Sequence, residues 1–250
     1  MKSALFVSFV RIPLLFIAAS IMFLLFAWSG LAFNFPFLPE LSTVFFTIVN
    51  IFCFYLMYRL LKKEGRSLKQ LIGFRKEVLG KDIAYGFFWL FVLYLPFVGA
   101  VMGTMFFLFG NDFINQFELV FAGDIANTSY ARPRWLLWFA AIVSLIFPFF
   151  NAPIEEIMYR GYAQPKFIQR TGKVWIGLLV PSIGFSLQHV MLAPSFEGAI
   201  VYATAFFVWG LGSAIIFYKQ QRLFPLIVCH FLVNIAFSAF PIAFLLFGVY

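Results

Sequence analysis

Seven apolar runs, each long enough to cross a lipid bilayer as a helix, are the feature of this sequence that most constrains its fold. A helix needs about 20 mostly apolar residues to span the hydrocarbon core of a membrane. Apolar residues follow one another within each run, without the alternation that transmembrane strands require. We therefore predict an all-α fold, a polytopic transmembrane helix bundle of about seven spans. The runs cover residues 12–33, 41–58, 83–109, 135–153, 174–193, 199–218 and 223–248.

The composition supports this fold class and excludes several others. Of the 250 residues, 63% are hydrophobic and only 11% are charged, whereas soluble domains carry about 25% charged residues. Too few polar side chains remain to cover a water-facing surface, which excludes a soluble enzyme, a disordered chain and a disulfide-rich secreted module. We expect residues 1–250 to form a single integral membrane domain. The sequence leaves its oligomeric state open.

The basic residues predict how the chain lies in the membrane. The net charge is +8, which in a soluble chain would indicate nucleic acid as a partner. Cytoplasmic loops of membrane proteins collect Lys and Arg, so the lipid bilayer is the expected partner and nucleic acid is not. With the N-terminus inside, all 18 basic residues except Arg132 and Arg134 fall on the cytoplasmic side. This predicts an N-in, C-out topology, and the compact loops favour a prokaryotic plasma membrane.

A small set of ionisable and amide side chains interrupts the later apolar runs. An ionisable group at membrane depth costs free energy, so each one is a candidate for function. The first three runs contain almost none, whereas the C-terminal half contains both histidines of the chain. The candidate residues are Glu155, Glu156 and Arg160 after the fourth run, His189 in the fifth, and His230 and Asn234 in the seventh.

The spacing of these residues indicates which of them share a helix face. Residues four apart lie on the same side of a helix, so Glu156 and Arg160 are expected to form an ion pair. Glu155 then points elsewhere and is free to face a cavity. Two further pairs with the same spacing are Phe185 with His189 and His230 with Asn234.

Peptide hydrolysis is a reaction that needs these groups together. A carboxylate in an apolar site, assisted by an imidazole, can hold and deprotonate a water molecule. A second imidazole and an amide can donate hydrogen bonds to the oxyanion that forms during attack. Alternatively, Glu155, His189 and His230 could bind Zn²⁺, which would lower the pKa of a bound water. The HExxH pattern of many zinc proteases is absent.

The three spaced pairs together resemble a known family of membrane proteases. Glu155-Glu156-Ile-Met-Tyr-Arg160 is similar to the EExxxR motif of the CAAX-protease and bacteriocin-processing family. Phe185 to His189 resembles its FxxxH motif, and His230 to Asn234 resembles its HxxxN motif. The resemblance covers residues 135–240, the expected protease core. Residues 1–134 hold three spans and their loops, to which no role is assigned.

The resemblance implies a glutamate-dependent intramembrane endopeptidase whose active site opens towards the cytoplasm. Glu155 and His189 would activate water, and His230 with Asn234 would form the oxyanion hole. The better-understood members work without a metal or other cofactor. The expected substrate is a membrane-associated or prenylated peptide or protein. The residues with an implied supporting role are Glu156, Arg160 and Phe185.

Two other functions remain open at this point. A non-catalytic immunity or regulatory protein of the same fold could keep the pocket to bind a peptide partner. A proton-coupled transporter could use the same glutamates and histidines as a relay. Every motif residue is present, which favours the enzyme, and the first three runs contain no counterpart to the motifs, which disfavours a transporter built from two similar halves.

Two expectations about helix geometry complete the prediction. On straight helices the candidate residues would lie at different depths, so the fourth helix should continue past Arg160 or the helices should bend. Gly99 and Gly103 form a small-xxx-small pair, which predicts close packing of the third span. The prolines expected to permit bending are Pro148, Pro153 and Pro181.

Overall fold

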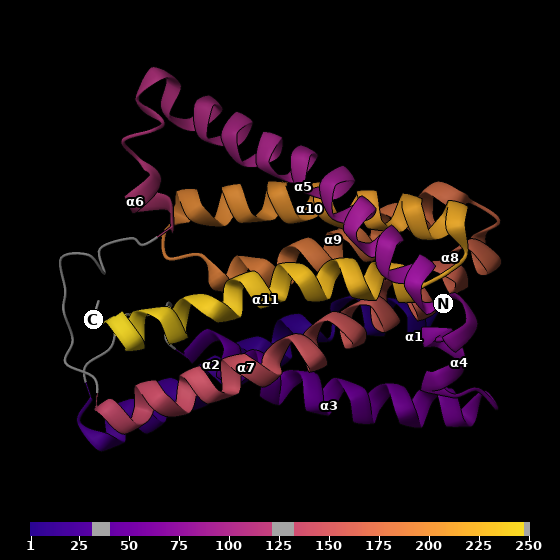
Figure 1. Cartoon of the computed structure of the whole chain (residues 1–250), viewed down its shortest axis with the longest axis horizontal. Coiled ribbons are helices and arrows are strands. Elements are labelled where there is room, and N and C mark those ends of the chain that lie inside the picture. The colour runs from indigo at the N-terminus through magenta and orange to yellow at the C-terminus, as the bar shows by residue number, and fades with distance from the viewer. Residues whose placement is uncertain (32–40, 122–132, 248–250) are drawn as a thin grey trace.

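The computed structural model is a bundle of helices that lie side by side along one long axis (Figure 1). It describes residues 1–31, 41–121 and 133–247, and these contain no strand. The α-helices are α1 Lys2–Phe9, α2 Arg11–Ser29, α3 Ser42–Lys63, α4 Leu68–Ile72, α5 Leu79–Phe109, α6 Phe117–Phe121, α7 Arg134–Glu156, α8 Gln164–Thr171, α9 Val174–His189, α10 Phe196–Gln220 and α11 Phe224–Phe247. A π-helix, Ile157–Ala163, joins α7 to α8, and short 3₁₀ turns cover Lys76–Val78, Gly110–Asp112 and Val190–Leu192.

The predicted class, a polytopic helical membrane bundle, is confirmed. Within the described ranges, six helical segments are long and apolar enough to cross a membrane, and the Phe224–Ala239 part of α11 forms a shorter apolar helix. The first segment differs from the prediction because it begins at Lys2 rather than residue 12. The six segments are Lys2–Ser29, Ser42–Lys63, Leu68–Asp112, Arg134–Thr171, Val174–Leu192 and Phe196–Gln220.

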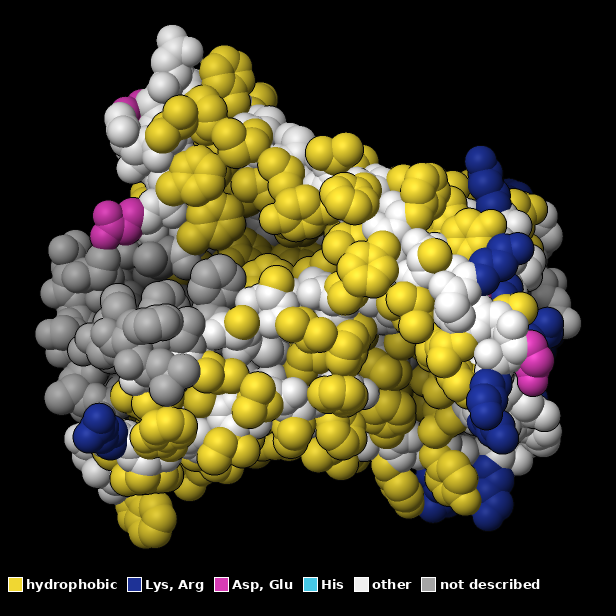
Figure 2. Space-filling model, in the orientation of Figure 1, with side chains coloured by type: hydrophobic (Ala, Val, Ile, Leu, Met, Phe, Trp, Pro, Cys, Tyr) yellow, Lys and Arg dark blue, Asp and Glu magenta, His cyan; other side chains and the backbone are white. Residues whose placement is uncertain are grey.

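Charged and apolar side chains occupy different parts of the surface. Figure 2 shows Lys and Arg gathered at the end of the bundle where the N-terminus lies, while hydrophobic side chains cover its length. Large exposed apolar residues such as Leu24, Leu95 and Phe107 are in place to contact lipid tails. The protein is thus an integral membrane protein. Arg132, one of the two basic residues predicted to lie outside, falls beyond the described residues.

A helical hairpin brings the fourth and fifth spans to a common depth. α7 does not end after Pro153 but continues through the π-helix and α8 to Thr171, as the predicted extension past Arg160 requires. Gly172, with φ 66°, then reverses the chain into α9. Glu155 lies about 16 residues before Thr171 and His189 about 15 residues after Val174, so at a rise of 1.5 Å per residue their depths match.

The seventh span is matched in depth by its contact with the π-helix. A Cβ on Gly161 would lie 3.1 Å from Leu223 Cδ2, just before α11 begins. Glu155 lies about six residues before Gly161, and His230 lies about seven residues after Leu223. Because the two helices run in opposite directions, both residues lie at a similar distance from this contact. The three motifs therefore meet at one level of the bundle.

Helices do not pack closely at Gly99 and Gly103, where the small-xxx-small spacing predicted close packing. A Cβ on either residue would meet nothing within 4 Å among the described atoms, so the predicted packing role is wrong. Both glycines occupy exposed positions on α5. Close approaches include Gly86, against Val228 of α11, and Gly184, against the backbone of Ser8.

Candidate active site

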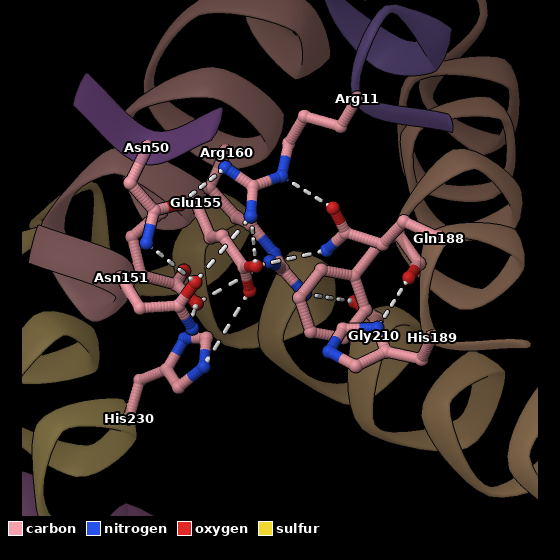
Figure 3. Close-up of polar contacts among 11 residues, drawn as sticks. Arg11, Asn50, Asn151, Glu155, Arg160, Gln188, His189, Gly210 and His230 are labelled. Atoms are coloured by element: carbon pink, nitrogen blue, oxygen red, sulfur yellow. Dashed lines mark hydrogen bonds and ion pairs between the residues drawn. The ribbon is translucent and has the colours of Figure 1, made fainter. Parts of the chain in front are cut away.

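Side chains from α2, α3, α7, the π-helix, α9 and α11 meet at one buried centre (Figure 3). Every motif residue predicted from the sequence lies in or beside this centre. Glu155 is 0% exposed, Glu156 and Arg160 are 1% exposed, and His189, His230 and Asn234 are each 5% exposed. The structure therefore brings the predicted residues together and removes their polar groups from the surface.

Glu156 is held by two partners through one oxygen. Its Oε1 lies 3.3 Å from Nη1 of Arg160, which confirms the predicted ion pair, and it accepts a bond of 3.0 Å from Nδ1 of His230. Arg160 also donates through Nη2 to the carbonyl oxygen of Gly210 at 3.1 Å. Its guanidinium lies 4.5 Å from the ring centre of Phe185. Arg160 thus links the π-helix to α9 and α10.

Phe185 packs between the two imidazoles. Its ring is fully buried, with its centre 4.6 Å from that of His189 and 6.1 Å from that of His230. Tyr159 meets it edge-on at 5.4 Å. The side chain of Phe185 has no polar atom, so the supporting role expected for it consists of packing against the neighbouring rings.

A π-helix carries the C-terminal half of the first motif. Ile157–Ala163 has wider turns than the α-helices on either side, and all seven of its residues are buried. Such segments occur mostly as short interruptions of α-helices and often at functional sites. The sequence predicted continuation of this helix but not the change in its turn. The π-helix directs Arg160 at Glu156 while the helix as a whole runs on.

Glu155 has a different set of partners from those expected. Its Oε1 forms an ion pair of 2.8 Å with Nη2 of Arg11 and accepts a bond of 3.0 Å from Nε2 of Gln188. Its Oε2 has no hydrogen-bond partner among the described residues and lies 3.6 Å from Nε2 of His230. Each glutamate therefore has its own arginine, and each leaves Oε2 without a hydrogen bond.

Arg11 is the main residue that the sequence analysis missed. It was grouped with the basic residues on the cytoplasmic side, but it lies on α2 inside the first span and is 0% exposed. Nη1 donates to Oδ1 of Asn50 at 2.7 Å, Nη2 lies 3.4 Å from Oδ1 of Asn151, and Nε donates to Oε1 of Gln188. Asn50 also donates to Asn151 at 3.2 Å.

A signal for these residues was present in the sequence. Asn50, Asn151 and Gln188 each interrupt an apolar run, where an unpaired amide is costly. They match no motif spacing, and an arginine near the end of an apolar run fits the ordinary charge rule. The sequence could have indicated buried polar partners, but not which residues pair.

A mostly apolar cavity of about 590 Å³ adjoins this centre. His189, His230, Asn234 and Asn151 supply its polar wall, while aromatic side chains of α5, α10 and α11 supply much of the rest. Glu155 and Glu156 do not line it, so the expectation that Glu155 faces a cavity is wrong. Arg11 and Gln188 draw its carboxylate behind the wall. The aromatic lining includes Phe91, Tyr94, Phe97, Tyr202, Phe206, Trp209 and Phe237.

The groups on the polar wall have defined hydrogen-bonding roles. Nδ1 of His189 lies 2.7 Å from the carbonyl oxygen of Phe185. Because a carbonyl only accepts, this nitrogen carries the proton and Nε2 of the neutral ring is an acceptor. The ring stacks on Phe206 at 3.7 Å, which fixes its orientation. Nδ2 of Asn234 is buried and has no partner among the described residues, so it can donate to a bound group.

The donor set does not fit the zinc alternative of Glu155, His189 and His230. In the described ranges, no three His, Cys, Asp or Glu side chains are placed to hold one metal ion. The guanidinium of Arg11 binds Oε1 of Glu155 and would repel a divalent cation there. These residues therefore do not fit a metal-dependent mechanism.

Comparison with known proteins places the three motifs in one family. Residues 118–236 match the family model described as type II CAAX prenyl endopeptidase Rce1-like. This stretch is a domain of that family. It contains all the motif residues and confirms the resemblance seen in the sequence, and the family supports membrane CAAX-type protease activity in general. No curated protein and no solved structure matches the chain. Arg11 and Asn50 lie outside the Rce1-like domain.

Proposed function

We propose that the protein is an intramembrane endopeptidase that hydrolyses a peptide bond in a membrane-associated or prenylated peptide. One observation carries the proposal. Two buried carboxylates, two imidazoles and an unpartnered amide gather beside one cavity, within a domain of a CAAX endopeptidase family. Burial of this many polar groups costs free energy, which chemistry at the centre would explain.

In this proposal Glu155 and His189 activate the attacking water. Oε2 of Glu155 has no hydrogen-bond partner among the described residues. Nε2 of His189 is an acceptor because Nδ1 of that ring carries the proton. As the water oxygen bonds to the carbonyl carbon, its proton passes to one of these acceptors. The C–N bond then breaks and the proton moves to the leaving amine. Oε2 of Glu155 lies behind the cavity wall, 3.6 Å from Nε2 of His230, which lines the cavity.

His230 and Asn234 stabilise the oxyanion in this mechanism. Nδ2 of Asn234 is a free donor at the cavity, and Nε2 of His230 becomes a second donor when the ring carries both protons. Glu155 and Glu156 lie beside that ring and balance its charge. Preorganised donors of this kind stabilise the charge that develops on the carbonyl oxygen.

The cavity supports an apolar substrate. Its volume of about 590 Å³ and its aromatic walls suit a lipid chain or large apolar side chains. The basic residues at the N-terminal end of the bundle support an N-in, C-out orientation with access from the cytoplasm. We place the protein in a prokaryotic plasma membrane, and we propose that it acts without a metal or other cofactor.

The test is an assay of purified protein in detergent with a farnesylated CAAX-type peptide and a library of apolar peptides. Wild type should release a cleaved product, and Glu155→Gln and His189→Ala should each lower kcat/KM by about 10²-fold or more. Glu77→Gln, a matched change at an exposed residue, should have no effect. Activity that survives both site substitutions refutes the proposal.

Two further outcomes separate the alternatives. A chelator should leave the rate unchanged, whereas inhibition that Zn²⁺ reverses would contradict the metal-independent mechanism. Wild-type protein that binds peptide but releases no product would instead indicate the non-catalytic immunity or regulatory function.

A further inference from the structure

Arg11 enters the buried centre from outside the matched domain. It lies on α2, whereas the family match begins at residue 118. Its guanidinium is the closest cation to Glu155, at 2.8 Å from Oε1, and no part of either side chain is exposed. A residue from the N-terminal helices, to which the sequence assigned no role, therefore contacts the carboxylate proposed to activate water.

The surrounding structure holds Arg11 in one position. α1 packs against the π-helix and α9, and a Cβ on Gly184 would collide with the backbone of Ser8. Asn50 of α3 accepts from Nη1 at 2.7 Å, and Gln188 of α9 accepts from Nε. The guanidinium fork thus has fixed acceptors on two helices besides the glutamate, which is the kind of site that Arg fills and Lys does not.

The contacts of Arg11 determine which oxygen of Glu155 remains available. Arg11 and Gln188 both bond to Oε1, so Oε2 alone is left to face Nε2 of His230 at 3.6 Å. Arg11 also supplies the charge that Glu155 needs next to the second carboxylate, because Arg160 is already paired with Glu156.

We propose that Arg11 is a positioning residue of the active site: it holds Oε1 of Glu155 so that Oε2 faces His230, which lines the cavity. The N-terminal helices thereby complete the centre that the Rce1-like domain begins. This inference rests on the proposed function of Glu155. It assigns Arg11 an effect on the rate and pH dependence of catalysis besides its contribution to the fold.

The experiment compares Arg11→Met and Arg11→Lys with a matched control, Arg222→Met. Arg222 pairs at 2.5 Å with the fully buried Asp82, and neither residue lines the cavity. Both Met variants therefore remove a guanidinium from a buried carboxylate, but only one does so at the proposed site. All are purified in detergent and assayed with the same farnesylated peptide over a range of pH.

Arg11→Met should lower kcat by about 10²-fold with little change in KM, because Glu155 loses its fixed orientation. Arg11→Lys should retain more activity, since it keeps the charge but not the fork. The acid side of the pH profile should move to higher pH in Arg11→Met, because Glu155 loses the guanidinium 2.8 Å from its Oε1 while Glu156, His230, Arg160 and the neutral His189 stay around it. Arg222→Met should keep the wild-type profile.

Wild-type kcat and pH profile in folded Arg11→Met would overturn the inference. If that variant does not fold, Arg11→Lys and Asn50→Ala decide, because Asn50 anchors Nη1 without contacting Glu155. Reduced kcat in both supports the positioning role, and wild-type kcat in both overturns it. Failure of the proposed function itself is distinct, since Glu155→Gln would then be as active as wild type.

Discussion

Glu155 and Glu156 are adjacent in the chain and both buried, an arrangement that costs free energy unless each carboxylate has a counter-charge. Arg11 pairs with the first and Arg160 with the second. The two pairs use Oε1 of each glutamate, and neither Oε2 has a hydrogen-bond partner among the described residues. The ion pairs that balance the two charges therefore also determine which oxygen of each carboxylate is left without a partner in the part of the chain that the structure describes.

Removal of Arg160 should destabilise the protein strongly. Arg160→Met leaves Glu156 buried without its ion pair and removes the side-chain hydrogen bond to Gly210, so we expect a loss of about 3–5 kcal/mol in unfolding free energy. Chemical unfolding in detergent measures it. Arg59→Met is the control, because Arg59 is exposed and its hydrogen bond among the described residues is to Tyr55. Equal stabilities of the two variants would contradict the assigned role of Arg160.

Asn234 should show the opposite pattern, with activity lost and stability kept. Because its Nδ2 has no partner among the described residues, Asn234→Ala breaks no hydrogen bond of that group in the folded protein. We expect kcat to fall by about 10²–10³-fold, the usual effect of losing an oxyanion donor. Thermal unfolding should change little. A variant that unfolds early but turns over normally would exclude the oxyanion role.

Single residues could be predicted only where a spacing revealed them. Glu156 with Arg160, and His230 with Asn234, are each four apart, so the sequence alone placed them together. Arg11 and Glu155 are 144 positions apart in the chain, and they meet because α1 and α2 pack against α9 and α1 packs against the π-helix that follows Glu155. A long-range pair of this kind has no local pattern.

At the scale of elements, the hairpin formed by α7, the π-helix, α8 and α9 sets the depth of the site. Its extension past Arg160 was predicted, because the motifs had to meet. The π-helix and the early start of the first span were not. Pro148 and Pro153 lie inside α7 without ending it, and Pro181 does the same in α9. The prolines in the sequence indicated where these helices could bend, but none of them marks the end of a helix.

The crossing of α1 and α9 should be sensitive to a single methyl group. Gly184→Ala would press Cβ into the backbone of Ser8, three residues before Arg11, so we expect a loss of about 1–3 kcal/mol and a lower kcat. Gly99→Ala is the matched control, because its Cβ meets nothing within 4 Å. Unfolding and turnover assays in detergent measure both. Wild-type behaviour of Gly184→Ala would contradict this close packing.

At the scale of the whole molecule, charge is distributed unevenly between the two ends of the bundle. The composition predicted the membrane and the helical class, because length and hydropathy act along the entire chain. It could not predict the cavity, whose walls come from α3, α5, α7, α9, α10 and α11. Such a space depends on how the side chains of six helices pack together, which no single sequence motif marks.

The orientation of the bundle can be tested with single cysteines. Both native cysteines, Cys53 and Cys229, are buried, so background labelling should be low. In intact cells, a membrane-impermeant maleimide should label Glu118→Cys and leave Lys69→Cys unlabelled until the membrane is permeabilised. Both positions are exposed in the protein. The reverse pattern would contradict the N-in orientation and an active site open to the cytoplasm.

The most direct measurement of the central claim is a single-turnover cleavage assay of wild type and Glu155→Gln in lipid nanodiscs, with one farnesylated peptide and product identification by mass. Glu155→Gln keeps the shape of the side chain and removes its charge. We expect wild type to release one hydrolysed product, and Glu155→Gln to do so at least about 10²-fold more slowly. The same product at the same rate from both proteins would contradict the account.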